Sequence, residues 1–324
     1  MSADAERRSR LLAVKLRALV RDHLGGEQPG ESPQVFAPGA ALLTDPRTWL
    51  LVDGDATRAL GACLAWGLRH GKPLSLLVER DSGLLARRAA LLDVDLEIWH
   101  VDDRALLPAI AEDHLPHVAP RPEHLAFSSL IESAGANVVV EHGVVAGEIR
   151  GLEICRVVDD PHTGETRLEV GLGAHDREAF AMVHGELPTE EALGRVVEAV
   201  AVHRADGADS HPLNRFGAER LMRWHALQNP ALIGFDSLDA AEPPVARTNV
   251  KDAVPCAAVG ERNGVRTVAV FAHGVDLDVV PFVLDAASRE GADEAVVVLR
   301  SRDVVAAHEE MTRLARMSVS ITRL

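Results

Sequence analysis

Lysine, tyrosine and other aromatic residues are scarce in this chain of 324 residues. Lysine occurs three times, tyrosine is absent, and aromatic residues make up 3% of the sequence. Proteins that bind single-stranded nucleic acids stack bases on aromatic side chains, so such a surface has little material here. The formal net charge of −15 also opposes a phosphate backbone, which is usually bound by a basic patch. Overall charge therefore disfavours a nucleic-acid partner, although a local basic surface would still permit one.

Cysteine is rare as well, and long apolar runs are absent. Cys63, Cys155 and Cys256 lie far apart and form no CxxC pair, which argues against a zinc ribbon or a disulfide framework. No stretch approaches the roughly 20 apolar residues of a membrane span, and the N-terminus lacks the apolar core of a signal peptide. We therefore expect a cytoplasmic protein without a membrane partner.

The short motifs of several enzyme classes are missing too. The sequence contains no GxGxxG or GxxxxGKS/T phosphate loop, no GxSxG elbow and no HExxH zinc motif. It does contain 47% hydrophobic and 26% charged residues, which is typical of a soluble protein with buried cores. Its length suggests two or three domains.

Residues 5–24 predict an amphipathic helix with leucines on one face and arginines on the other. Leu12, Leu16 and Leu19 belong to the apolar face. The arginines would suit a phosphate, a membrane surface or a partner, whereas the simpler interpretation is a surface helix packed on the body. A segment rich in Gly and Pro follows, so residues 1–34 are assigned to a basic amphipathic helix and a linker.

Residues 49–103 alternate apolar strands with helices, a pattern that predicts parallel βαβ units buried on both faces. We assign residues 35–118 to this N-terminal α/β module. Ligands of such sheets bind at the carboxyl ends of the strands. Those ends carry six acidic residues, namely Asp53, Asp55, Glu79, Asp81, Asp102 and Asp103. They would either form a ligand-sensing rim or, as Asp55 and Asp81 are well suited to do, cap the helices that follow.

Residues 137–180 form the densest stretch of strand signal. Its β-branched runs are residues 138–140, 144–158 and 166–173. The segment 159–165 combines Asp, Pro, Thr and Gly, each of which favours turns. We therefore expect three antiparallel strands joined by tight turns.

The flanking segments complete the predicted architecture. Helices are expected over residues 124–135 and 188–203, so that a helix, the three-stranded antiparallel meander and a second helix form a central module over residues 119–236. Residues 237–324 begin with a Pro-rich linker and continue as a C-terminal α/β segment. This segment has too few strands to stand alone, so we expect it to complete a neighbouring sheet. The fold class is therefore α/β and α+β.

Strand alternation places Glu153 and Glu169 opposite one another in the meander and separates Glu153 from Arg156. Like charges directly opposite on a sheet are destabilising. A divalent cation between the two carboxylates would remove that cost, because hard metals prefer carboxylate oxygens. The alternative is that both glutamates lie on the solvated face of a one-sided sheet.

The order helix, three strands, helix and strand over residues 123–272 resembles the core of the PD-(D/E)XK nuclease superfamily. The resemblance implies a divalent-metal site for Mg²⁺ or Mn²⁺, with acidic residues on the second and third strands, a lysine that activates water and a supporting helical glutamate. The matching catalytic positions are Glu132, Glu153 and Glu169, and the metal ligands are Glu153, Asp160 and Glu169, with Glu148 as an alternative for the second strand. The chain departs from the family at Gly171, which stands in the place of the lysine. Arg167 cannot replace the lysine as a base, since its guanidinium stays protonated.

Two further clusters contain side chains that could bind a metal ion or a phosphate. His175, Asp176 and Glu178 form either a metal site or an ordinary surface turn. His211, Asn214 and Arg215 are candidate phosphate contacts, together with the arginines of the following helix, Arg220 and Arg223. This most basic local surface is alternatively a structured loop in which Asn214 caps a helix and the arginines pair with acids.

The chain from about residue 45 onward resembles a group of actinobacterial proteins of no known activity. The segments VVVEHGVVAGEIRGLEICRVV, LEVGLGAHDREAF, HPLNRF and GVDLDVVPF carry the resemblance as a set. It implies a bacterial, cytoplasmic protein. We expect a non-catalytic binding or scaffolding protein with a degenerate nuclease-like core and with a protein partner or a second copy. The alternative is a Mg²⁺- or Mn²⁺-dependent nuclease or phosphodiesterase, so the sequence leaves open whether the chain is an enzyme.

Overall fold

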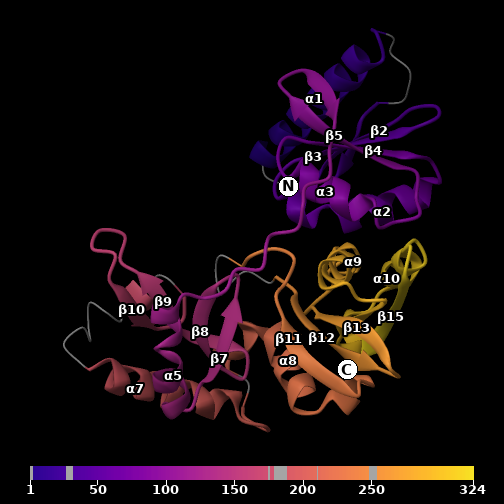
Figure 1. Cartoon of the computed structure of the whole chain (residues 1–324). Coiled ribbons are helices and arrows are strands. Elements are labelled where there is room, and N and C mark those ends of the chain that lie inside the picture. The colour runs from indigo at the N-terminus through magenta and orange to yellow at the C-terminus, as the bar shows by residue number, and fades with distance from the viewer. Residues whose placement is uncertain (1–2, 27–31, 174–175, 179–187, 210, 248–253) are drawn as a thin grey trace. The chain divides into compact units, whose positions relative to one another are not determined.

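The computed structural model (Figure 1) describes residues 3–26, 32–173, 176–178, 188–209, 211–247 and 254–324. The chain divides into two compact units. The first contains residues 1–114, 275–295 and 301–321, and the second contains residues 115–274, 296–300 and 322–324. The fold class is α/β and α+β, as the sequence predicts. Within the described part of the chain, no helix combines the length and the apolar character needed to cross a lipid bilayer.

The N-terminal sheet has six strands in the order β1-β2-β3-β4-β5-β6. They are β1 (Gln34–Phe36), β2 (Gly39–Leu43), β3 (Thr48–Val52), β4 (Leu74–Val78), β5 (Leu96–Asp102) and β6 (Ala105–Pro108). Strands β3, β4 and β5 run parallel, which confirms the predicted βαβ units. The antiparallel strands β1, β2 and β6 extend this sheet at its two edges and were not predicted.

The helices of the first unit follow the expected alternation. They are α1 (Ala3–His23), η1 (Ala56–Arg58), α2 (Leu60–His70), α3 (Ser82–Ala89), α9 (Val279–Glu290), η4 (Ser301–Asp303) and α10 (Ala306–Thr312). Helix α1 packs on the sheet, because Leu16, Leu19 and Val20 are buried in the core that lies against β2 and β3. The basic N-terminal helix is therefore a docked surface helix, the simpler of the two interpretations of its sequence.

Much of the acidic rim of this sheet is engaged in local structure. Arg8 of α1 forms an ion pair with Asp53 at 2.6 Å, and Lys15 pairs with Glu79. Asp55 caps η1 by accepting a hydrogen bond from the Thr57 amide at 3.0 Å, as predicted. Asp81 lies at the N-cap position of α3 but makes no side-chain cap bond there, so its predicted capping role is wrong.

The central sheet has four antiparallel strands in the order β10-β9-β8-β7. They are β7 (Asn137–Glu141), β8 (Val144–Ile149), β9 (Leu152–Asp159) and β10 (Thr166–Val170). The three-stranded meander is therefore corrected to four strands, because the apolar run 144–158 folds back on itself in the middle. Arg150 and Gly151 make this turn with φ angles of 45° and 82°, the positive values that a tight hairpin requires.

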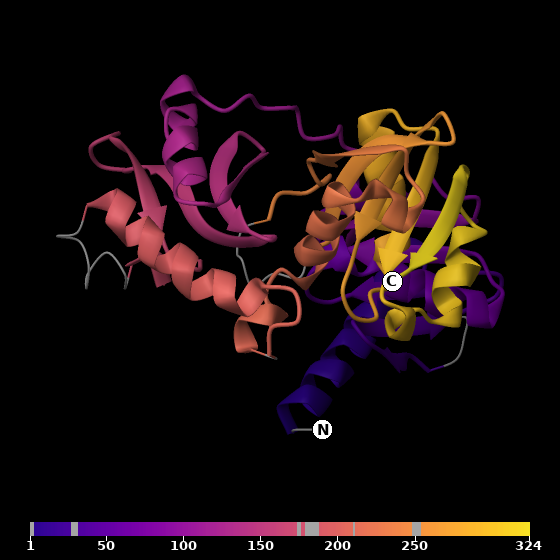
Figure 2. The same cartoon turned by 90° about the horizontal axis from the view of Figure 1, so that it is seen from below.

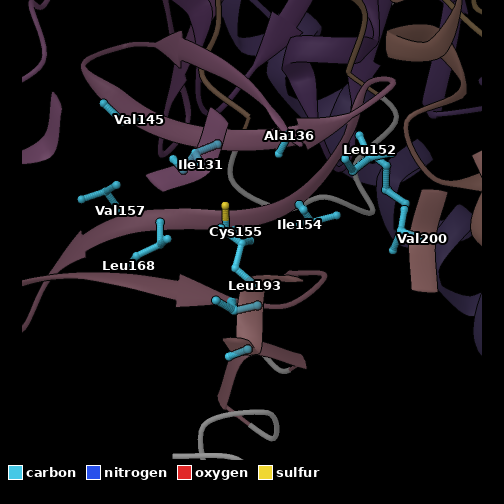
Figure 3. Close-up of a cluster of buried hydrophobic side chains, with 13 residues drawn as sticks. Ile131, Ala136, Val145, Leu152, Ile154, Cys155, Val157, Leu168, Leu193 and Val200 are labelled. Atoms are coloured by element: carbon cyan, nitrogen blue, oxygen red, sulfur yellow. The ribbon is translucent and has the colours of Figure 1, made fainter. Parts of the chain in front are cut away.

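One face of the central sheet packs on helices α5 (Ser128–Ser133) and α7 (Thr189–Arg204). Figure 3 shows this core, in which Cys155 lies among Ile131, Val157 and Leu193. Helix α7 runs along the sheet in both overall views (Figure 2), in agreement with its contacts to β8, β9 and β10. The short helix α4 (Pro122–Leu125) precedes α5. Helix α5 lies within the predicted helix 124–135, and α4 overlaps the start of that range. The polar side chains therefore lie on the opposite face of the sheet.

The C-terminal part has a sheet of its own with the order β11-β12-β13-β14-β15. Its strands are β11 (Ser237–Ala241), β12 (Cys256–Arg262), β13 (Val265–Phe271), β14 (Glu294–Leu299) and β15 (Ser318–Arg323). Our expectation that this segment completes a neighbouring sheet is wrong, because the predicted linker begins with strand β11, which pairs with β12. The hairpin between β12 and β13 is confirmed, and Asn263 and Gly264 supply its positive φ angles of 53° and 75°.

Helix α8 (Ala218–Gln228) lies between the 3-10 turns η2 (Pro212–Arg215) and η3 (Pro230–Ile233). Its apolar side chains Met222 and Ala226 are buried with residues of β12 and β13. The arginines of α8 contact the central sheet instead, so this helix connects the meander with the strands that follow it.

Candidate functional site

A β-bulge in strand β9 determines which side chains share the polar face of the central sheet. Gly147 pairs with Cys155, whereas the next residue, Glu148, pairs with Glu153, so Ile154 is an extra residue in β9. A bulge of this kind resets the alternation of side chains along its strand. Glu153 and Arg156 consequently lie on one face, where the Arg156 Nε and Nη2 atoms donate to the Glu153 carboxylate at 2.9 and 2.8 Å. The prediction that separated these two residues is wrong, since it assumed strict alternation.

The polar face brings two glutamates directly opposite one another. Glu148 and Glu153 are register partners on β8 and β9, and their residues are only 4% and 1% exposed. Like charges in such a pair repel, and burial strengthens the repulsion because the local dielectric constant is low. Neither glutamate lies on a solvated face, so the solvated alternative is also wrong for Glu153.

Helix α8 supplies the cations for Glu148 and for Glu141 of β7. Arg220 donates through Nη1 to Glu148 at 2.5 Å and through Nη2 to Glu141. Arg223 donates through Nη1 to the other oxygen of Glu141 at 3.1 Å. Gly151 permits this approach, because a Cβ atom there would lie 2.4 Å from the backbone carbonyl carbon of Arg220.

Glu153 has three arginine partners that come from different parts of the second unit. Besides Arg156, Arg177 donates through Nη1 at 3.2 Å, and Arg247 donates through Nη2 at 2.6 Å. Arg177 also donates through Nε to Glu169 at 3.3 Å, so one guanidinium joins the two predicted metal ligands. Glu169 is the register partner of Arg156, not of Glu153, which corrects the predicted pairing.

These contacts form one set of side chains, the Arg–Glu network. Its acids are Glu141, Glu148, Glu153, Glu169 and Asp160, and its arginines are Arg156, Arg167, Arg177, Arg220, Arg223 and Arg247. The arginines keep Glu141 and Glu153 ionised. Burial raises the pKa of Glu141, but Arg220 and Arg223 lower it to about 2. Burial likewise opposes ionisation of Glu153, and the hydrogen bond and charge of Arg156, with Arg247 and Arg177, still lower its pKa.

The predicted catalytic and metal-binding acids do not converge. Glu132 is exposed on α5, which packs on the opposite face of the sheet through Ile131. Asp160 lies in the exposed turn after β9, where it accepts hydrogen bonds from the amides of His162 and Thr163 at 2.8 and 3.0 Å. Among the residues that the structure describes, no three His, Cys, Asp or Glu side chains form a group that could hold a metal ion.

The candidate phosphate contacts His211, Asn214 and Arg215 belong to the short 3-10 turn η2 and its N-cap. His211 begins η2 by accepting a hydrogen bond from the Leu213 amide at 3.3 Å, and its ring stacks on His203. Asn214 is half-buried and Arg215 is exposed. Arg220 and Arg223 are buried against the carboxylates of the sheet, so they are not part of the predicted basic surface, and the alternative, in which the arginines pair with acids, is confirmed for this pair. The phosphate contacts of His211, Asn214 and Arg215 stay a prediction. His175 of the other cluster lies outside the described residues.

A cavity of about 60 Å³ lies within the Arg–Glu network. Its charged lining consists of Glu141, Glu148, Glu153, Arg156, Arg220 and Arg247. The Nε and Nη1 atoms of Arg247 and the Nε atom of Arg220 are buried and have no hydrogen-bond partner in the described part of the chain. Burial, and secondly repulsion by Arg220, lower the pKa of Arg247.

Arg156, Arg177 and Arg247 are the residues that sequence reasoning missed. The only local signal was the presence of four arginines among the nine acidic residues of the stretch 137–180. Arg247 lies 94 residues from Glu153 in a segment that was predicted to be a linker, so no spacing rule could pair them.

Comparisons with known proteins add no family to this description: no protein-family model, no curated protein and no solved structure matches the chain. The resemblance to the PD-(D/E)XK nucleases therefore stays a prediction.

Proposed function

We propose that the chain is a non-catalytic binding protein of the bacterial cytoplasm, whose central module has a nuclease-like order of elements and ion pairs in place of a metal site. One observation carries the proposal: each predicted carboxylate on the sheet itself, Glu148, Glu153 and Glu169, already pairs with at least one arginine. A divalent metal needs carboxylate oxygens that are free to coordinate it. The guanidinium groups occupy these oxygens and supply the positive charge that a metal would bring.

The place of the missing lysine supports the same proposal. Gly171 has a φ angle of 136°, and a Cβ atom there would lie 2.9 Å from the backbone nitrogen of Arg177. Any side chain at this position would collide with the segment that carries Arg177 across the sheet. The position is therefore closed to a lysine unless that segment moves, and Arg177 would then lose its contacts with Glu153 and Glu169.

The proton chemistry of the network also disfavours hydrolysis. A general base works best when its pKa lies near the working pH. The pKa of Glu141 is about 2, and that of Glu153 is lowered by its arginines, so both are weak bases. The arginines cannot accept a proton at all. These features favour binding over the metal-dependent phosphodiesterase alternative.

Thermal unfolding with and without Mn²⁺ tests the proposal on the full chain and on Glu169→Ala. We expect the same melting temperature at zero and at saturating Mn²⁺ for both proteins, together with no cleavage of single-stranded or double-stranded DNA or RNA. A metal site would instead raise the melting temperature of the wild type through preferential binding to the folded state. A rise that disappears in Glu169→Ala, accompanied by Mn²⁺-dependent cleavage, would replace the proposal with the nuclease alternative.

A further inference from the structure

The Arg–Glu network carries more arginines than acids. Six guanidinium groups face five carboxylates in the part of the chain that the structure describes. Buried charges are normally paired, because an unpaired ion in a medium of low dielectric constant is strongly disfavoured. The buried Arg204 and Glu219 interact with this network by charge and add one charge of each sign, so among the described residues the arginines stay in excess by one.

The unused donors identify where a balancing negative charge belongs. Arg247 uses only Nη2, which binds Glu153, and its buried Nε and Nη1 atoms have no partner among the described residues. Arg220 uses both terminal nitrogens, and its buried Nε atom is likewise unpartnered there. The side chains of Arg247 and Arg220 are 5% and 2% exposed, and both line the cavity. Buried donors of charged groups that lack a partner are costly, and an acceptor in the cavity would satisfy them.

The chemistry of the cavity selects the ligand. Nε and Nη1 lie on different edges of the Arg247 guanidinium, so each is a single donor, and together with Nε of Arg220 they offer three separate N–H groups to the oxygens of an oxyanion. The volume of about 60 Å³ exceeds the space of a single water molecule and limits the occupant to a small group. Glu141, Glu148 and Glu153 also line the cavity, but their charges are matched by Arg220, Arg223, Arg156 and Arg177.

We infer that this cavity is a binding site for a small oxyanion of phosphate size, held by Arg247 and Arg220 at the polar face of the central sheet. The inference rests on the proposed binding function and gives it a ligand class. The occupant is either a free phosphate ion or the phosphoryl group of a small monoester, since both present the same oxygens to these donors. Side chains from β9, from α8 and from the segment after β11 meet at the cavity, so the occupied site would link these three parts of the second unit.

Isothermal titration of the full-length protein with inorganic phosphate, in EDTA and at constant ionic strength with chloride as balance, tests the inference. We expect saturable binding of one phosphate per chain. Competition with glycerol phosphate distinguishes the two sources: displacement of phosphate indicates a site that accepts a monoester, and failure to displace it indicates a site for the free ion. A wild-type protein that shows no phosphate binding above the chloride control overturns the inference.

Matched variants assign the site to the cavity. Arg247→Gln removes the guanidinium with its Nε and Nη1 donors, and we expect about 10- to 100-fold weaker binding, the range for loss of a charged hydrogen-bonding partner. Arg177→Gln is the control, because it also removes one arginine from Glu153 but does not line the cavity, and its affinity should change less than about threefold. Arg247→Lys keeps the charge beside Glu153 without the Nε and Nη1 donors, so it provides a second comparison if Arg247→Gln fails to fold. Equal affinity in wild type, Arg247→Gln and Arg247→Lys would place phosphate elsewhere and overturn the inference.

The two proposals fail in different ways. Absence of phosphate binding together with indifference to Mn²⁺ would remove the oxyanion site and leave the non-catalytic function intact. Mn²⁺-dependent cleavage would remove the non-catalytic function, whatever the result of the metal-free titration.

Discussion

Arg220 of α8 donates to Glu148 of β8 across 2.5 Å, and the two side chains are only 2% and 5% exposed. The pair connects the helix that packs on the C-terminal strands to the middle of the central sheet. Burial makes each ionised side chain unfavourable on its own, so each of the two charges is stabilised by the other. A buried pair of this kind is sensitive to the loss of one member, which leaves the other charge uncompensated.

Replacement of Arg220 by methionine is therefore expected to be severe. Arg220→Met leaves Glu148 buried without its cation, and we expect a loss of about 3–5 kcal/mol in the free energy of unfolding. Urea unfolding of the full chain, followed by circular dichroism, measures this loss. Arg167→Gln is the control, because Arg167 is 51% exposed and surface ion pairs contribute about 0–1 kcal/mol. Similar losses in the two variants would contradict the assignment of a buried, interdependent pair.

Gly151 allows the backbone of α8 to approach the turn between β8 and β9 closely. Its φ angle is 82°, and a Cβ atom would lie 2.4 Å from the carbonyl carbon of Arg220. Gly151→Ala should therefore destabilise the protein by about 2 kcal/mol or more, through backbone strain together with displacement of α8. Gly164→Ala is a matched control: its φ angle is 71°, but nothing lies within 4 Å of an added Cβ atom, so only the backbone penalty of about 1 kcal/mol remains.

Hydrogen exchange of the α8 amides separates the two contributions in Gly151→Ala. We expect faster exchange in α8 for Gly151→Ala and wild-type exchange there for Gly164→Ala. Equal effects of both substitutions would mean that the close approach of Arg220 to Gly151 is unimportant.

The sequence predicted those parts of the fold that depend on local patterns. The parallel strands β3, β4 and β5 follow from apolar runs between helices, and the hairpin at Asn263 and Gly264 follows from turn chemistry. The turn at Arg150 and Gly151 was missed because the apolar residues on both sides form one uninterrupted strand pattern. Strand β11 was missed because its short sequence borders a Pro-rich segment.

The site depends on features that no local pattern contains. The extra residue Ile154 becomes visible only when β9 is paired with β8, and it moves Arg156 onto the face of Glu153. Arg177 and Arg247 reach Glu153 from 24 and 94 residues away in the chain. The acidic positions on the strands could be identified from the sequence, but the three arginines that bind Glu153 could not.

The low pKa of Glu141 predicts a specific loss of stability in acid. Its folded pKa of about 2 lies below the ordinary glutamate value of 4.5, so the unfolded chain binds more protons between these pH values. The stabilisation is therefore complete above about pH 4.5 and is lost as the pH falls toward 2. The shift corresponds to about 3 kcal/mol. Glu141→Gln should cost about this much at pH 7 and progressively less below pH 4.5, as measured by urea unfolding at pH 7, 4 and 3.

Glu132→Gln provides the comparison for this titration, because Glu132 is exposed and lies outside the Arg–Glu network. It should change stability by less than about 0.5 kcal/mol at any of the three pH values. A constant difference between wild type and Glu141→Gln from pH 7 to pH 3 would contradict the ion pairing of Glu141 with Arg220 and Arg223.

Asp278 in the first unit predicts the opposite dependence on pH. Its carboxylate is buried and accepts a hydrogen bond from the Gly61 amide at 2.9 Å. Burial, assisted by repulsion from Asp276, raises its pKa to about 6. The folded protein therefore binds this proton more tightly than the unfolded chain, so the contribution to stability is present below about pH 4 and is lost as the pH rises through 6. The ionised carboxylate costs up to about 3 kcal/mol at pH 8.

Asp278→Asn keeps an oxygen that can accept the Gly61 hydrogen bond and removes the buried charge. We therefore expect the variant to be more stable than the wild type at pH 8, by up to about 3 kcal/mol, and to lose this advantage as the pH falls from 6 to 4. Asp276→Asn should not show this gain in stability at pH 8, because the substitution removes the ion pair that Asp276 forms with Arg58 at 2.6 Å. Urea unfolding of the three proteins at pH 8 and pH 5 measures both effects. A lower stability of Asp278→Asn at pH 8 would show that the ionised carboxylate is needed to hold α2, since its hydrogen bond to Gly61 would then outweigh the cost of burying its charge.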